Sequence, residues 1–192
     1  MALTTAQQTT LKNYILSDPI LNAYPQNSDG AYAINEELKK YPVTDFLVWN
    51  PVTPVQDIID AVDGSKYTPS DTIPTTTTEL SQIYQSRILA CQTKQISLQT
   101  LIFGRDTINA SKSNIRAWLR DAVIQVPSGT NGAFTAPGGS SGATALTACL
   151  RKANTIEKVL SSGTATTGTV TANLLTFSGT LSYQDVEQAR SS

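Results

Sequence analysis

A stripe of regularly spaced residues between Glu79 and Gly104 constrains the fold of this chain more than any other feature. The stripe keeps the spacing of one helix face through Leu80, Tyr84, Arg87, Ile88, Cys91, Gln95, Leu98 and Ile102. A helix from Glu79 to Phe103 is about 37 Å long. Its other faces hold almost no charge and carry the amides of Gln82, Gln85, Gln92 and Gln99. Because amides enter protein contacts without the desolvation cost of ions, we predict a long central helix that also faces other protein.

Shorter patterns lie on both sides of this segment. Capping residues, apolar spacing and proline stops predict helices over residues 4–17, 31–41, 55–62, 109–126 and 146–160. Residues 46–49 include aromatic and β-branched residues and are bounded by Asp45 and by Asn50-Pro51, which favours a short strand. After Gly168 the apolar residues alternate, which predicts a C-terminal strand or hairpin over 169–181. The predicted fold class is mainly α, a helical bundle with a long central helix and a small β annex.

The same patterns predict how the chain is organised. A length of 192 residues suits one domain or at most two small ones. Residues 1–168 are expected to form a helical body, with internal loops at 65–78 and 127–142 that are rich in Pro, Thr, Gly and Ser. Residues 169–192 are expected to form a C-terminal β arm and a terminal turn, which Ser182 and Asp185 open at capping-box spacing.

The composition argues against catalysis. The chain has no histidine, which removes the commonest general base and most catalytic zinc sites. Cys91 and Cys149 lie far apart among apolar positions, which favours buried free thiols over a metal site. We therefore expect no enzyme activity, no cofactor and no metal. No stretch approaches 18 apolar residues, so we also expect no membrane contact.

Charge is distributed unevenly along the chain. Residues 1–86 hold four basic and ten acidic side chains, whereas residues 87–158 hold nine basic and three acidic ones. One interpretation is that a compact domain folds its acidic helices onto its basic ones. The other is that a basic face meets a neighbour's acidic face, or phosphate, in a head-to-tail assembly that closes into a ring. The basic contacts would then be Arg105 and a ladder at four-residue spacing, Lys112, Arg116 and Arg120, opposite the apolar face of its helix.

Several segments, in the same order over nearly the whole chain, resemble a family of small structural proteins of tailed bacteriophages. They are residues 3–7 (LTTAQ), 27–34 (NSDGAYAI), 45–49 (DFLVW), 90–95 (ACQTKQ), 104–109 (GRDTIN), 112–116 (KSNIR) and 181–186 (LSYQDV). The resemblance implies a virion component of the neck, made in the host cytoplasm. It implies a head-to-tail adaptor that forms a ring, twelvefold by analogy with portals, between the portal protein and the tail or nozzle protein.

The implied partners and the alternatives follow from this location. A neck ring can contact DNA transiently in its lumen, and its C-terminal arm would reach a neighbouring subunit through Leu174, Phe177 and Tyr183. A tail terminator or a capsid decoration protein is the alternative within the same particle. A small nucleic-acid-processing enzyme of the phage is the alternative from another class, because residues 87–158 are basic.

Overall fold

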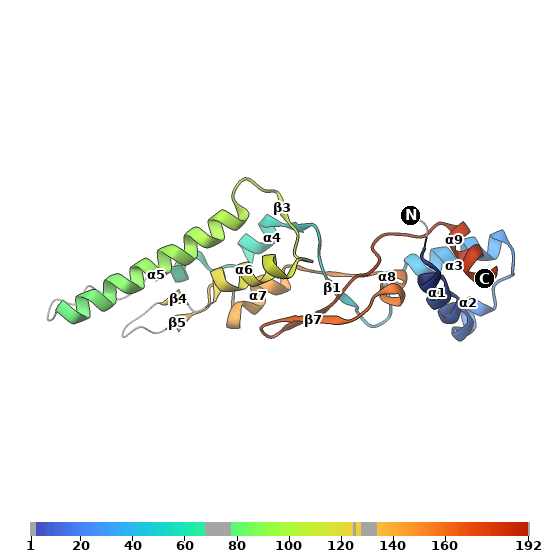
Figure 1. Cartoon of the computed structure of the whole chain (residues 1–192), viewed down its shortest axis with the longest axis horizontal. Coiled ribbons are helices and arrows are strands. Elements are labelled where there is room, and N and C mark those ends of the chain that lie inside the picture. The colour runs from blue at the N-terminus through green and yellow to red at the C-terminus, as the bar shows by residue number, and fades with distance from the viewer. Residues whose placement is uncertain (1–2, 68–77, 125, 128–133, 192) are drawn as a thin grey trace. The chain divides into compact units, whose positions relative to one another are not determined.

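The computed structural model describes residues 3–67, 78–124, 126–127 and 134–191 (Figure 1). Within these residues nine α-helices form: α1 (Thr5–Ser17), α2 (Pro19–Asn22), α3 (Ser28–Lys39), α4 (Val55–Asp60), α5 (Thr78–Ile102), α6 (Ser113–Val123), α7 (Ala143–Thr147), α8 (Thr155–Leu160) and α9 (Tyr183–Ser191). The strands are β1 (Leu47–Trp49), β2 (Thr53–Pro54), β3 (Thr107–Ile108), β4 (Val126–Pro127), β5 (Phe134–Thr135), β6 (Leu150–Lys152), β7 (Thr164–Thr167) and β8 (Val170–Asn173). The predicted loops at 65–78 and 127–142 lie partly outside the described residues.

A four-stranded mixed sheet, in the order β6-β1-β8-β7, corrects the predicted fold class. Strand β1 runs parallel to β8, with Val48 opposite Asn173. Strand β6 runs antiparallel to β1, because Ala153 N–H donates to the Phe46 carbonyl while Asn50 N–H donates to the Cys149 carbonyl. The described residues are 57% helical, but the chain is an α/β mix. The prediction of a helical bundle with a small β annex is therefore wrong.

The physical reason lies in residues 146–160, which were predicted to be one helix. The segment is split into α7, β6 and α8. The split follows from Asn154, whose side chain accepts the Glu157 N–H while Glu157 reaches back to the Asn154 N–H, so that α8 begins afresh. Three-residue strands such as β6 are too short to show a period of their own.

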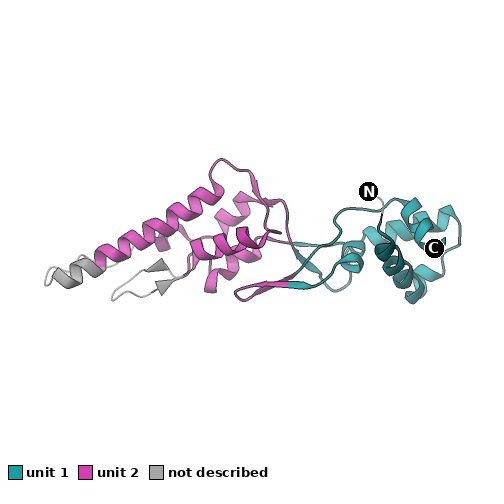
Figure 2. Cartoon of the chain, viewed as in Figure 1, with its two compact units in different colours: residues 1–48, 151–164, 173–192 teal, residues 49–150, 165–172 magenta. Residues whose placement is uncertain are grey.

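The chain forms two compact units, shown in Figure 2. Unit 1 consists of residues 1–48, 151–164 and 173–192, and unit 2 of residues 49–150 and 165–172. Each unit therefore contains part of the expected helical body and part of the expected C-terminal arm.

Unit 1 has a helical core between α1, α3, α8 and α9. Leu11, Ile15, Ile34, Leu38, Ile156 and Val186 are its most deeply buried large apolar side chains. Phe177 and Leu181 also belong to this core, although they were predicted to lie in a C-terminal strand. The observed hairpin, β7 and β8, begins at Thr164 and ends at Asn173. Between the hairpin and α9 the chain is irregular, because Phe177 and Leu181 anchor it to helices and not to another strand.

Unit 2 contains the long helix, and the prediction of a helix over 79–103 is confirmed by α5. One face of α5 packs on α6 (Figure 1) and contributes Cys91, Leu98 and Leu101 to a core that also holds Leu119 and Leu146. The Trp118 Nε1 donates to the Ser97 hydroxyl at 2.8 Å. The Lys94 ammonium lies 2.7 Å from the Asp121 carboxylate. These contacts use only one side of α5.

Candidate interaction surfaces

The outer side of α5 is exposed and uncharged. Among the α5 side chains that the structure describes, the exposed ones are Gln85, Ser86, Leu89, Gln92, Thr93, Gln95, Ile96, Gln99 and Thr100, and Phe103 directly follows the helix. We call these ten residues the α5 face. A helix side that faces water ordinarily carries charged residues. A broad face without any is typical of protein contact.

An apolar line runs along the middle of the α5 face. Leu89, Ile96 and Phe103 are 65%, 60% and 85% exposed. Their seven-residue spacing places them in one row, because seven residues are close to two helical turns. The row spans about 21 Å at the helical rise. Exposed apolar rows of this kind mark interaction sites.

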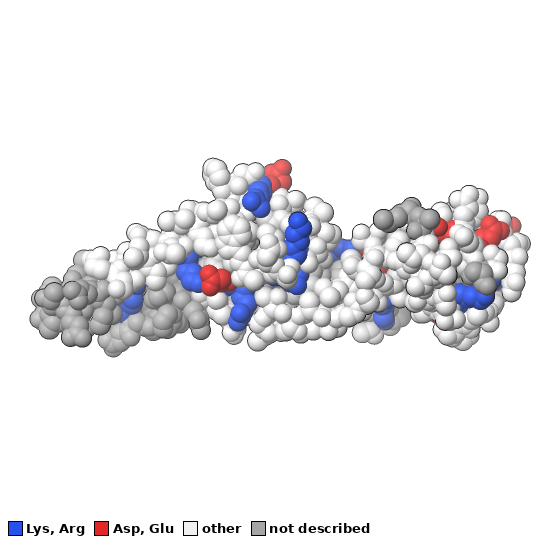
Figure 3. All heavy atoms as spheres, viewed as in Figure 1, with Lys and Arg blue, Asp and Glu red and all other residues white. Residues whose placement is uncertain are grey.

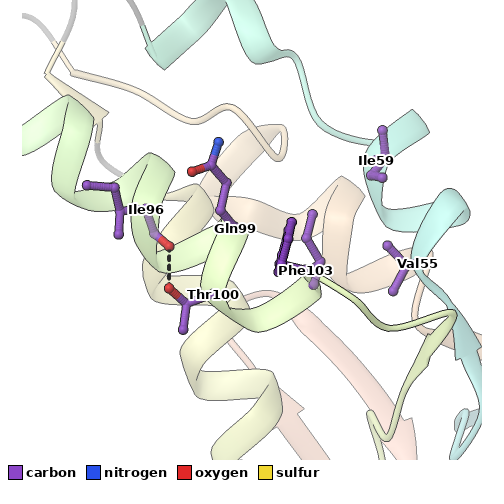
Figure 4. A pocket seen from close by; sticks show the side chains of 7 residues that line it. Val55, Ile59, Ile96, Gln99, Thr100 and Phe103 are labelled. Atoms are coloured by element: carbon purple, nitrogen blue, oxygen red, sulfur yellow. Dashed lines mark hydrogen bonds between the residues drawn. The ribbon is translucent and has the colours of Figure 1, made fainter.

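The row ends in a groove between α5 and α4, with a volume of about 760 Å³. Figure 4 shows Ile96 and Gln99 on α5, Phe103 directly after the helix, and Val55 and Ile59 on α4 across from Phe103. The Thr100 hydroxyl donates to the Ile96 carbonyl at 2.8 Å. Because that hydroxyl is already bonded within its own helix, the groove can accept an apolar side chain without leaving this donor unpaired.

A second groove, of about 650 Å³, lies in unit 1 between α1, α2, the end of α3, the 41–44 segment and α8. We call it the unit 1 groove. Tyr14 and Val159 contribute apolar surface to it. Ile20, Tyr41 and Val43 stand at its edges and are 69%, 68% and 108% exposed. No helical or strand period connects these residues, and the sequence predictions did not include them.

The charges of the unit 1 groove cancel. Its lining holds Asp18, Glu37, Lys40 and Lys158. The Lys40 ammonium lies 2.7 Å from the Glu37 carboxylate, and this hydrogen bond raises the pKa of Lys40 above its ordinary value. The Asp18 carboxylate accepts the N–H groups of Ile20 and Leu21 at 2.9 and 3.1 Å. Burial, and then the nearby Asp18 charge, raise the pKa of Tyr14.

The basic ladder is not the surface that was predicted. Arg116 is only 5% exposed. Its guanidinium lies 4.7 Å from the centre of the Trp49 ring and donates to the Ala110 and Ser111 carbonyls at 2.9 and 2.8 Å. Desolvation lowers the pKa of Arg116. The prediction that it projects from a solvent-facing side is wrong, because it lies three positions before buried Leu119 and a helix places residues at that offset on one face.

The other predicted contact residues lie in both units. Arg105 and Lys112 are exposed, and Arg120 is partly buried. These three belong to unit 2, as Arg116 does, whereas Leu174, Phe177 and Tyr183 belong to unit 1. Leu174 and Tyr183 are partly exposed, but Phe177 is a core residue of unit 1. The prediction of Phe177 as a surface contact is therefore corrected.

The cysteines and possible metal ligands of the described residues do not gather into a metal site. In the part of the chain that the structure describes, no group of three or more His, Cys, Asp or Glu residues could hold a metal ion. Cys91 and Cys149 are buried free thiols, and burial raises the pKa of Cys149 to about 12. Its thiolate is therefore suppressed at neutral pH. On the face drawn in Figure 3, most of the surface is uncharged, and the charged side chains lie singly or as adjacent basic and acidic groups.

Two further findings concern membrane spans and similarity to known proteins. Among the helices in the described ranges, none has the length and apolar character needed to span a bilayer. Comparison with family models, with curated proteins and with solved structures found no match to the chain. The two apolar surfaces, one in each unit, are thus the features from which a function can be inferred.

Proposed function

We propose that this chain is a structural virion protein of a tailed bacteriophage, a head-to-tail adaptor that forms a ring between portal and tail. The observation that carries the proposal is the α5 face, which is exposed, apolar along its middle and free of charge. Permanent protein interfaces have this chemistry, because ions are costly to desolvate at their centre. The resemblance of seven segments to small phage structural proteins supplies the particle and the place within it.

A head-to-tail adaptor has two different ends, so all its copies must point the same way. Contacts between such copies are heterologous, meaning that two different surfaces of the same chain meet. The chain has two distinct apolar surfaces, the α5 face in unit 2 and the unit 1 groove. This supports an assembly in which every copy contacts one neighbour through one surface and another neighbour through the other surface.

The surface composition supports a binding role without a chemical step. The α5 face offers amides and hydroxyls beside its apolar row, and these groups can hydrogen-bond to a neighbour at low desolvation cost. We propose the portal and the tail or nozzle protein as the partners at the two ends of the ring, with transient DNA contact in its lumen.

Electron microscopy tests this proposal directly. The purified protein should form rings, twelvefold by analogy with portals, and an antibody against it should label the neck of the virion. A sixfold ring at the tail would favour the tail-terminator alternative, and label over the capsid shell would favour a decoration protein. Absence of the protein from purified virions would contradict all three virion roles.

A further inference from the structure

We propose that the α5 face of one copy binds the unit 1 groove of the neighbouring copy. This inference rests on the proposed function, because an adaptor ring requires two different surfaces of identical chains to meet. It goes further by naming which two surfaces these are. Both lie within single units, so each can be described from its own contacts.

The shapes and side chains of the two surfaces match. On the α5 face, Ile96 and Phe103 are 60% and 85% exposed, so they protrude from the helix although they also form one wall of the groove toward α4. The unit 1 groove is a hollow between helices, with Tyr14 in its wall and Tyr41 and Val43 at its edges. A helix that lays its apolar row into such a groove is a common recognition mode. Aromatic side chains on both surfaces add favourable ring contacts.

The charges of the two surfaces match as well. The α5 face has none, so a groove with unpaired charge would lose hydration without compensation. In the unit 1 groove, the Glu37 carboxylate is already bonded to Lys40, and the Asp18 carboxylate is already bonded to backbone N–H groups. The exposed Lys158 at its edge can keep its ammonium in water while its stem is covered. The groove can therefore be covered by a neutral helix.

A second pairing, α5 against α5 across a two-fold axis, makes a different prediction. It would close a dimer, leave the unit 1 groove uncovered and give an assembly with two identical ends. Such an assembly does not suit an adaptor between unlike partners. The experiment below separates the two pairings.

The test uses two double variants of the full chain. The helix variant carries Ile96→Glu and Phe103→Glu, and the groove variant carries Tyr41→Glu and Val43→Glu. All four side chains are exposed, so each variant should keep the circular dichroism spectrum of the parent. Val52→Glu in unit 2 and Tyr32→Glu in unit 1 are matched controls, because these side chains are 59% and 57% exposed and lie outside both surfaces.

Analytical ultracentrifugation should show multi-subunit assemblies for the parent and for both controls. Each double variant alone should be monomeric, with association weakened by about 100-fold or more, as for the loss of central interface residues. An equimolar mixture of the two double variants should form a one-to-one dimer and nothing larger. The helix variant still has an intact groove, and the groove variant still has an intact α5 face, so one contact can form between them.

Three outcomes would overturn this pairing. They are dimers of the groove variant alone, as in an α5 pair, a mixture that stays monomeric, and a parent that is monomeric at every concentration. Antibody labelling of virions separates this result from the proposed function. A dimer in the mixture without label at the neck supports the contact and rejects the function. Label at the neck together with normal assembly of the groove variant supports the function and rejects the contact.

Discussion

Units 1 and 2 both bury charged side chains, but the charge of Glu157 in unit 1 and that of Arg116 in unit 2 are compensated differently. In unit 1 the Glu157 carboxylate, 3% exposed, meets both terminal nitrogens of Arg151 at 2.7 and 2.8 Å. It also accepts the N–H groups of Asn154 and Gly179. In unit 2 the Arg116 guanidinium meets backbone carbonyls and the Trp49 ring, and no carboxylate of the described residues forms an ion pair with it.

This difference determines how the stability of each unit responds to pH. A carboxylate titrates, so a unit that depends on a buried ion pair is sensitive to acid. Carbonyl groups and an indole ring do not titrate in the accessible range, so a cation held by them is insensitive. In both units the charged group ties irregular backbone to a helix, at Gly179 in unit 1 and at Ala110 and Ser111 in unit 2.

Arg116→Met should have the largest effect on stability. The change keeps an apolar stem but removes the hydrogen bonds to the Ala110 and Ser111 carbonyls and the cation–π contact with Trp49. The expected loss is about 3 kcal/mol of unfolding free energy. Urea titration followed by tryptophan fluorescence measures it within unit 2, because Trp49 and Trp118 both lie there. Lys112→Met, at an exposed position of the same ladder, is the control, and an equal loss in both would show that burial does not matter.

Glu157→Gln should lower the unfolding free energy somewhat less than Arg116→Met does, by about 2 kcal/mol. The amide nitrogen of the new side chain would face donors, since every partner of Glu157 is an N–H group. Arg151 is partly exposed and can regain water, which limits the loss. Thermal unfolding followed by circular dichroism measures it. Glu36→Gln, at an exposed pair with Lys39, should change stability by no more than about 0.5 kcal/mol, and a comparable loss there would remove the distinction.

Local patterns predicted the helices of this fold better than its sheet. Helix α1 begins where Thr4 and Gln7 form a capping box, and α5 follows its stripe from Thr78 to Ile102. Each of these two signals is made by residues that are close together in the sequence, so a local pattern reveals it directly. The pairing of β1 with β6 and β8 joins segments about a hundred residues apart. No local period reveals such a pairing, and the predicted bundle was wrong for that reason.

The candidate surfaces were predictable only in part. The low charge of α5 indicated a helix that faces other protein, but the exposed row of Leu89, Ile96 and Phe103 was not identified. Its seven-residue spacing was the available signal. The unit 1 groove had no such signal, because Ile20, Tyr41 and Val43 come together only through the packing of α2, the 41–44 segment and α8. Arg116 was misplaced because its burial depends on Trp49 and Thr167, which are distant in sequence.

Acid should weaken unit 1 through Glu157. Burial by itself raises the pKa of this carboxyl, but hydrogen bonds from Arg151, Gly179 and Asn154 outweigh burial and hold the pKa below its ordinary value of 4.5. A lowered folded-state pKa means that the contribution is complete above 4.5 and is lost as pH falls further. As the pH is lowered through and below 4.5, the unfolding free energy measured by circular dichroism should decline in the parent and decline less steeply in Glu157→Gln. Arg116→Met should keep the parental slope, and a flattened slope there would contradict the assignment to Glu157.

The smallest effect is expected at an exposed ion pair, which separates charge from burial. Lys94 of α5 lies 2.7 Å from the Asp121 carboxylate of α6, but 70% of the Asp121 side chain is exposed. Water and salt screen such a pair, and Lys94 also donates to the Asp121 backbone carbonyl, which a side-chain change leaves in place. Asp121→Asn should therefore change the unfolding free energy by no more than about 0.5 kcal/mol, and added salt should reduce even that difference. Tryptophan fluorescence in urea measures it in the same unit as Arg116→Met. The opposite result would be a loss of unfolding free energy as large as that of Arg116→Met and unaffected by salt. It would show that a surface ion pair stabilises unit 2 as strongly as the buried contacts of Arg116 with carbonyl groups and the Trp49 ring.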